Sequence, residues 1–234
     1  MINKKIQIIP AILAKSFEDL EVKLNLLKEA YQILGMEEKL MVQIDICDDE
    51  LFENINFSII QRYLDIFDFE LDLMNINIDL NLIDGQSKIT ERFSELGNSG
   101  FERIVFHYED WGEKLSNFEF ENFSPDIGLA LIPNTSTKTI YPYLNKINFV
   151  QFMGIDRVGV QGSSFNPAVI EKIREFRKEN PEMIISVDGG VNLENSRDLV
   201  DAGAERLAIG SAIFGENNSS QQIAENIEKL NNLS

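Results

Sequence analysis

Residues 184–192 read IISVDGGVN, and residues 207–215 read LAIGSAIFG. Each stretch is a short apolar run that stops at a glycine-containing turn, which is typical of a strand that leads into a helix. Glycine lets the backbone approach a ligand closely, and N–H groups at a helix start bind anions. One such turn more often only connects two elements, whereas two in succession favour a pocket for a phosphorylated small molecule. The candidate donors are Gly189, Gly190, Gly210 and Ser211.

Apolar residues recur at helical spacing between strand-like runs. The first helix is expected over Phe17–Leu34, with Ser16 as a candidate N-cap. Weaker helical patterns lie near Ser58–Phe67 and near Trp111–Asn122. The clearest later helices are expected at Val169–Phe176 and Ile223–Leu230.

Strand-like runs alternate with these helices along the whole chain. Because the runs are almost wholly apolar, the strands are expected to be parallel and covered on both faces. Eight strand–helix units in 234 residues predict a (β/α)8 TIM barrel, one domain over residues 1–234 without a linker. The expected strands are Ile6–Leu13, Leu40–Ile46, Phe69–Ile76, Arg103–Tyr108, Ile127–Ile132, Phe149–Ile155, Met183–Asp188 and Arg206–Ile209.

Composition and charge exclude several kinds of partner. The formal net charge of −18 argues against DNA or RNA, because nucleic-acid affinity depends on Lys and Arg. No apolar run approaches the length of a membrane span, so no membrane partner is expected. Residues 1–5 lead directly into a strand-like run without a secretory apolar core, which predicts a cytoplasmic location. Cys47 is the only cysteine, so an intrachain disulfide is excluded.

In a barrel of this kind the active site lies at the carboxyl ends of the strands. Three carboxylates fall there, Asp45, Asp72 and Asp188. A buried carboxylate costs several kcal/mol unless it is paired or bound to a cation, so three together indicate a functional site. The single histidine, His107, ends the fourth expected strand. A hydrogen-bonded structural role is favoured for it over a role as metal ligand or acid/base.

Several segments carry a family resemblance in the same order along the chain. VDGGVN at 187–192 and GSAIF at 210–214 match the ribulose-phosphate 3-epimerase family almost letter for letter. The chain resembles this family nearly from end to end. The other similar segments are PAIL at 10–13, QIDICD at 43–48, LDLM at 71–74, GLALIPNT at 128–135 and MGIDRVGVQGSSFNP at 153–167.

The resemblance implies a barrel of the ribulose-phosphate-binding type that moves a proton on and off C3 of a ketose phosphate. The acid and base then fall on Asp45 and Asp188, which are both present. The family's metal set of two His and two Asp falls on Gln43, Asp45, Asp72 and Asp188, so both histidines are absent. An all-oxygen set suits Mg²⁺, Mn²⁺ or Ca²⁺ better than Zn²⁺, and a site without a metal is the alternative.

The resemblance also implies contacts to substrate. Met74 and Met153 are retained beside the reacting carbon, and Gly159 and Gly162 join the glycines named above as phosphate donors. Two positions depart from the family: Ala11 stands in place of serine, and Cys47 in place of methionine. The loop at 156–162 departs as well.

These observations predict an isomerase, a sugar-phosphate epimerase that uses two Asp as acid and base on a small phosphorylated sugar. The alternative is a non-catalytic or differently specific sugar-phosphate-binding paralogue that has lost the usual metal site. A third option is another lyase or isomerase on the same barrel, weakened because no Lys ends a strand to form a Schiff base. Family analogy also predicts a homo-oligomer, with the Phe-rich residues 118–123 as a candidate interface.

Overall fold

The computed structural model describes residues 6–47, 57–74, 99–117, 124–159, 163–215 and 219–232. Eight parallel strands close into a barrel in the order of the sequence, with β8 paired to β1. The predicted (β/α)8 TIM barrel is therefore confirmed. The strands are β1 (Gln7–Leu13), β2 (Leu40–Ile46), β3 (Phe67–Leu73), β4 (Phe101–His107), β5 (Asp126–Leu131), β6 (Phe149–Met153), β7 (Ile184–Asp188) and β8 (Arg206–Ile209).

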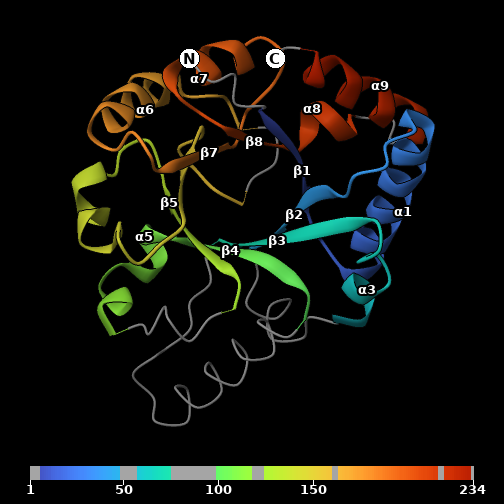
Figure 1. The fold of residues 1–234 in the computed structure, drawn as a ribbon, viewed down its shortest axis with the longest axis horizontal. Coiled ribbons are helices and arrows are strands. Elements are labelled where there is room, and N and C mark those ends of the chain that lie inside the picture. The colour runs from blue at the N-terminus through green and yellow to red at the C-terminus, as the bar shows by residue number, and fades with distance from the viewer. Residues whose placement is uncertain are drawn as a thin grey trace.

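Helices surround the strands in Figure 1. Four of them are short, so much of the covering layer in the described residues comes from α1, α6 and α9. The bounds of the α-helices are α1 (Phe17–Leu34), α3 (Phe57–Gln61), α5 (Tyr108–Trp111), α6 (Ala168–Glu179), α7 (Ser196–Ala202), α8 (Ser211–Phe214) and α9 (Ser220–Asn231). Two 3-10 helices are η1 (Gly112–Asn117) and η3 (Thr137–Tyr143).

Local chemistry explains where α1 begins and ends. The Ser16 hydroxyl accepts a hydrogen bond of 3.1 Å from the Asp19 N–H, which satisfies one of the free donors of the first turn. Gly35 ends the helix in the left-handed region, with φ of 61°. The predicted cap and the bounds of this helix are confirmed.

The structure corrects the first of the two weak helix predictions and describes part of the second. The helix expected near Ser58–Phe67 ends at Gln61, and tight turns follow it. Phe67 instead opens β3, where its ring packs in the core against Tyr31 and Tyr63. The second of these patterns forms α5 and η1 over residues 108–117, since Gly112 breaks the α-helical geometry. The rest of this prediction, residues 118–122, and the candidate interface at 118–123 lie outside the described residues.

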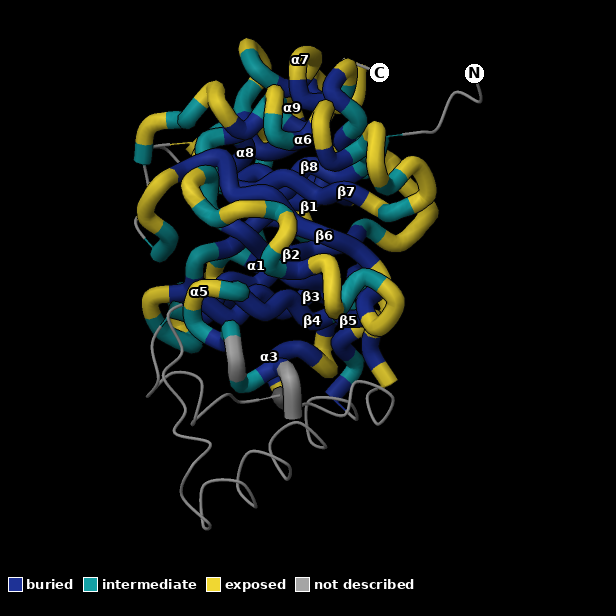
Figure 2. The backbone as a smooth tube through the Cα atoms, turned by 90° about the vertical axis from the view of Figure 1, so that its left-hand side faces the viewer, coloured by how far each residue is buried: buried dark blue, intermediate teal, exposed yellow. Residues whose placement is uncertain are grey.

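Two layers of buried side chains hold the barrel. Outward-facing strand residues pack against the helices in one large apolar core, and Figure 2 shows the strands as a buried centre beneath partly exposed helices. Inside the barrel a small apolar cluster contains Val105, Ala130, Phe149 and Met153. Gly128 makes room for it, because a Cβ at this position would lie 2.3 Å from the Phe149 ring. The remaining interior residues are largely polar, which is unusual for a core and leads to the site.

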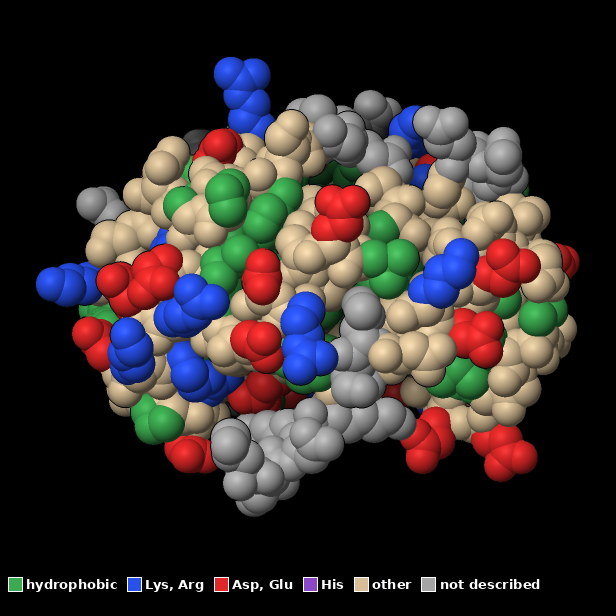
Figure 3. All heavy atoms as spheres, turned by 90° about the horizontal axis from the view of Figure 1, so that it is seen from above, with side chains coloured by type: hydrophobic (Ala, Val, Ile, Leu, Met, Phe, Trp, Pro, Cys, Tyr) green, Lys and Arg blue, Asp and Glu red, His purple; other side chains and the backbone are tan. Residues whose placement is uncertain are grey.

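The surface is charged and mixed. Figure 3 shows acidic and basic side chains interspersed on the face seen from above. None of the helices in the described ranges combines the length and apolar character that a membrane crossing requires.

Candidate functional site

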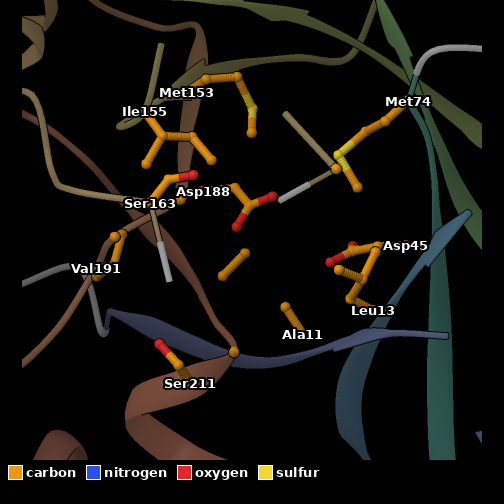
Figure 4. A pocket seen from close by; sticks show the side chains of 15 residues that line it. Ala11, Leu13, Asp45, Met74, Met153, Ile155, Ser163, Asp188, Val191 and Ser211 are labelled. Carbon is orange, nitrogen blue, oxygen red and sulfur yellow. The ribbon is translucent and has the colours of Figure 1, made fainter. Parts of the chain in front are cut away.

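A pocket opens at the carboxyl ends of the strands, where the fold predicts a site (Figure 4). It contains nine of the residues expected from the sequence: Asp45, Met74, Met153, Gly159, Asp188, Gly189, Gly190, Gly210 and Ser211. The other lining residues are Ala11, Leu13, Ile155, Ser163, Val191 and Ala208. Gly162 lies outside the described residues.

Three buried carboxylates converge beside this pocket. Asp45 and Asp188 are each 7% exposed, and Asp72 is fully buried. Parallel pairing of β2 with β3 sets Asp45 next to Asp72, and one oxygen from each of the three acids lies within 4.8 Å of the others. Like charges at this separation repel strongly in a medium of low polarity. The cluster therefore requires shared protons, hydrogen-bond donors or a cation.

The Gln43 side chain points its amide nitrogen at all three acids. Nε2 lies 2.7 Å from Asp45 Oδ1, 3.1 Å from Asp188 Oδ2 and 3.5 Å from Asp72 Oδ2. An amide nitrogen carries two protons, so the two shorter contacts are the effective hydrogen bonds. The amide oxygen of Gln43 is buried and has no hydrogen-bond partner among the described residues.

Asp72 has its own donors. His107 Nε2 lies 2.9 Å from Asp72 Oδ1, and Gln151 Nε2 donates to Asp72 Oδ2 at 2.7 Å. Burial lowers the pKa of His107, but the charge and hydrogen bond of Asp72 outweigh it and leave the pKa raised. His107 is thus a buried, hydrogen-bonded histidine, as the sequence favoured.

Burial sets the acidity of the two acids that face the pocket. It raises the pKa of Asp45 to about 7, together with the charge of Asp72, and the hydrogen bond from Gln43 opposes this rise. The pKa of Asp188 is also raised, first by burial and then by the charges of Asp45 and Asp72. A carboxyl group with the pKa of Asp45 exchanges protons near neutral pH, which suits a general acid or base.

The turn after β7 supplies backbone groups to the pocket. Gly189 and Gly190 have φ of 93° and 68°, a region that other residues rarely adopt. A Cβ on Gly190 would lie 3.0 Å from the backbone of Phe165. The Gly190 carbonyl accepts a hydrogen bond of 2.9 Å from the Asn195 side chain, which fixes the turn. The glycines are therefore required by the close packing of this turn as well as by its position at the pocket.

Reasoning from strand ends missed Gln151 and Ser163. Gln151 is the central residue of β6, FVQFM, so it does not end a strand, but a polar residue within an apolar strand was a usable signal. Ser163 lies in the loop after β6 and lines the pocket. Its sequence neighbours contain no comparable signal.

The barrel and its site place the chain in the class of (β/α)8 proteins whose functional groups gather at the carboxyl ends of the strands. The family model for the ribulose-phosphate 3 epimerase family matches residues 7–214. The chain belongs to this family.

Curated relatives agree with this assignment. Ribulose-phosphate 3-epimerase, cytoplasmic isoform, of Oryza sativa subsp. japonica is 31% identical over 140 residues, which cover 57% of this chain and 59% of that protein. The ribulose-phosphate 3-epimerase of Schizosaccharomyces pombe is 32% identical over 53% of this chain and 55% of its own length. The chain thus matches between half and three fifths of these two relatives. The ribulose-phosphate 3-epimerase of Synechocystis is 26% identical over 95% of this chain and 93% of its own length.

Solved structures with low identity support the fold alone. A mutant tryptophan synthase α-subunit from Pyrococcus furiosus superimposes with a TM-score of 0.68 at 15% identity, over 97% of this chain and 98% of that one. A 3-hexulose-6-phosphate synthase superimposes with a TM-score of 0.59 at 16% identity, over 97% of this chain and 99% of that one.

Proposed function

We propose that this protein is an epimerase of a ketose phosphate, with ribulose 5-phosphate as the first candidate substrate. The observation that carries the proposal is the pair Asp45 and Asp188, two buried carboxyl groups of raised pKa in one pocket. Membership of the epimerase family supports the same class of reaction.

Inversion at a carbon needs a base on one side and an acid on the other. Asp45 lies one residue before the end of β2 and Asp188 ends β7, with β1 and β8 between these strands. Their carboxyl groups enter the pocket from different sides in Figure 4. In the proposed reaction one carboxylate removes the proton next to the ketone, and the other carboxylic acid returns a proton to the opposite face. Gln43 holds both side chains by donating to each of them.

The phosphate is assigned to the glycine turns after β7 and β8. Gly189, Gly190, Gly210 and Ser211 line that part of the pocket and offer neutral N–H and O–H donors. Such donors suit a chain with a net charge of −18, which would repel an anion at long range. Gly159 also lines the pocket and is proposed as a further backbone donor to the phosphate, as is Gly162, which lies outside the described residues. Met74 and Met153 supply apolar walls that exclude water from the reacting carbon.

A divalent cation is compatible with the acid cluster. Asp45, Asp72 and Asp188 offer oxygens that are close enough to share one ion, and Gln43, whose Nε2 approaches all three acids, is the fourth member of the expected set. Bound there, the ion would supply positive charge against the negative charge that develops as the proton leaves carbon. His107 and Gln151 would hold Asp72 in place, and hard oxygen donors favour Mg²⁺ or Mn²⁺ over Zn²⁺.

The direct test is deuterium exchange. The protein is incubated in D₂O with ribulose 5-phosphate, in EDTA or with added Mg²⁺, Mn²⁺ or Zn²⁺, and deuterium at C3 is followed by NMR. We expect incorporation at C3 with appearance of the C3 epimer. Binding of the sugar phosphate without exchange in any of these conditions would reject the epimerase and favour a non-catalytic binding protein.

A further inference from the structure

Gln43 is a neutral side chain whose amide lies between three acids. The nitrogen and the oxygen of this amide differ in their hydrogen bonding. Nε2 donates to Asp45 and Asp188, whereas Oε1 is buried and meets no donor in the part of the chain that the structure describes. A buried carbonyl oxygen without a donor loses its hydrogen bonds to water and gains none in exchange, which is unfavourable. The opposite orientation would be less favourable, because Oε1 would then face the carboxylate oxygens of the acids and repel them. Charge in the cluster thus decides which end of the amide points inward.

The spacing around Nε2 also suits a cation. Nε2 lies 2.7–3.5 Å from one oxygen of each acid, and the acid oxygens lie within 4.8 Å of one another. Ligand atoms that share one cation at about 2.0–2.6 Å are separated by roughly 3–5 Å. An amide nitrogen has no lone pair for such an ion, but an amide oxygen is an ordinary ligand for it. Rotation of the terminal carboxamide by half a turn would exchange the two atoms without moving the backbone.

We propose that Gln43 works in two orientations, donating through Nε2 to Asp45 and Asp188 when no ion is bound and coordinating a hard divalent cation through Oε1 when one is. The inference rests on the cation set of the proposed function but not on turnover. It explains how the cluster stays paired in either state, because the amide replaces part of the missing positive charge when the ion leaves. Asp72 needs no such exchange, since its donors are His107 and Gln151, which lie on strands other than that of Gln43.

Metal binding without substrate tests the proposal. Protein stripped with EDTA is titrated with Mn²⁺ by calorimetry and by the EPR signal of free Mn²⁺. Gln43→Met keeps the size of the side chain and removes the oxygen ligand, so we expect Mn²⁺ affinity to fall at least 10-fold. Gln43→Glu presents an oxygen in either orientation and is expected to bind Mn²⁺ at least 10-fold more tightly. Gln7→Met, the same exchange at the opposite end of the barrel, is the matched control and should leave the affinity unchanged.

The rotation has its own signature. The side-chain NH₂ signals of Gln43, assigned by their loss in Gln43→Glu, should be protected from solvent exchange in EDTA and should shift when the protein is saturated with Mg²⁺. The proposal is overturned if these signals do not move, if Gln43→Met binds Mn²⁺ like the wild type, or if the wild type binds no divalent cation. None of these measurements uses a sugar phosphate, so failure of deuterium exchange would reject the epimerase and leave this inference standing.

Discussion

The barrel interior contains two polar layers, and each of them compensates buried carboxyl groups with different partners. Near the amino ends of the strands, Glu70 is fully buried and forms an ion pair with Arg206. Gln7 accepts from Arg206 at 3.2 Å and from Arg103 at 3.4 Å, and the Arg206 guanidinium lies 4.5 Å above the Phe149 ring. At the carboxyl ends, three acids share amide and imidazole donors instead.

One strand contributes to both layers. Glu70 and Asp72 are two residues apart on β3, so their side chains point to the same side of the strand. Burial raises the pKa of Glu70, and the charge of Arg206 opposes that rise. Among the described residues, no Lys or Arg forms an ion pair with Asp45 or Asp188. We call the layer in which Glu70 meets the permanent cation Arg206 the paired layer. We call the layer in which Asp45 and Asp188 accept from the neutral amide of Gln43 the unpaired layer.

Removing an acid from the unpaired layer should have the largest effect on function. Asp188→Asn keeps the shape of the side chain but removes the base, so we expect C3 deuterium exchange to fall about 10²–10⁴-fold. Circular dichroism should show an intact fold. Exchange at the wild-type rate would exclude Asp188 from proton transfer.

Removing the cation of the paired layer should damage stability instead. Arg206→Met leaves Glu70 buried and unpaired, which is expected to cost about 3–5 kcal/mol. Urea unfolding at pH 7 measures this loss. The double variant Glu70→Gln/Arg206→Met carries no orphaned charge and should recover part of it. If the double variant is as unstable as Arg206→Met, loss of packing rather than an unpaired charge is the cause.

The unpaired layer also predicts a pH dependence. Because the pKa of Asp45 is raised to about 7, folding binds a proton between about pH 4 and pH 7, and this group lowers stability as pH rises through that window. Asp45→Asn should therefore be more stable than the wild type at pH 8, by roughly 2–4 kcal/mol, and nearly equal to it at pH 4. Urea unfolding in EDTA at both values provides the check. A variant that is less stable than the wild type at pH 8 would contradict it.

The smallest effect is expected when His107, the hydrogen-bond partner of Asp72, is replaced. His107→Phe removes the partner of Asp72 Oδ1 without touching the pocket-lining acids. We expect the rate of C3 deuterium exchange and the affinity for Mn²⁺ each to fall about 10-fold, as is usual when the group that orients a carboxylate is lost. His107→Gln keeps a donor on the side chain and should retain more of both. Equal losses in the two variants would assign His107 to packing alone.

The sequence predicted most of the barrel because apolar periodicity reports directly on burial. β2 and β8 and the helix α1 have their predicted bounds, and Asp45, Asp72 and Asp188 meet as their strand ends required. Prediction failed where an apolar residue fits both the helical spacing of 3.6 residues and the strand spacing of two. Phe67 is such a residue: the pattern assigns it to a helix, but it opens strand β3. It also missed Gln151, which faces the site from mid-strand.

By itself the sequence determined the order of strands and helices, the glycine turns at the pocket and the identity of the acids, since each of these depends on local spacing and residue chemistry. Only the tertiary structure decided which groups compensate those acids. Gln43 is two residues from Asp45 in the chain but 145 from Asp188, and His107 reaches Asp72 from the neighbouring strand. Closure of the barrel brings these donors within hydrogen-bond distance of the acids, because it places strands far apart in the sequence side by side.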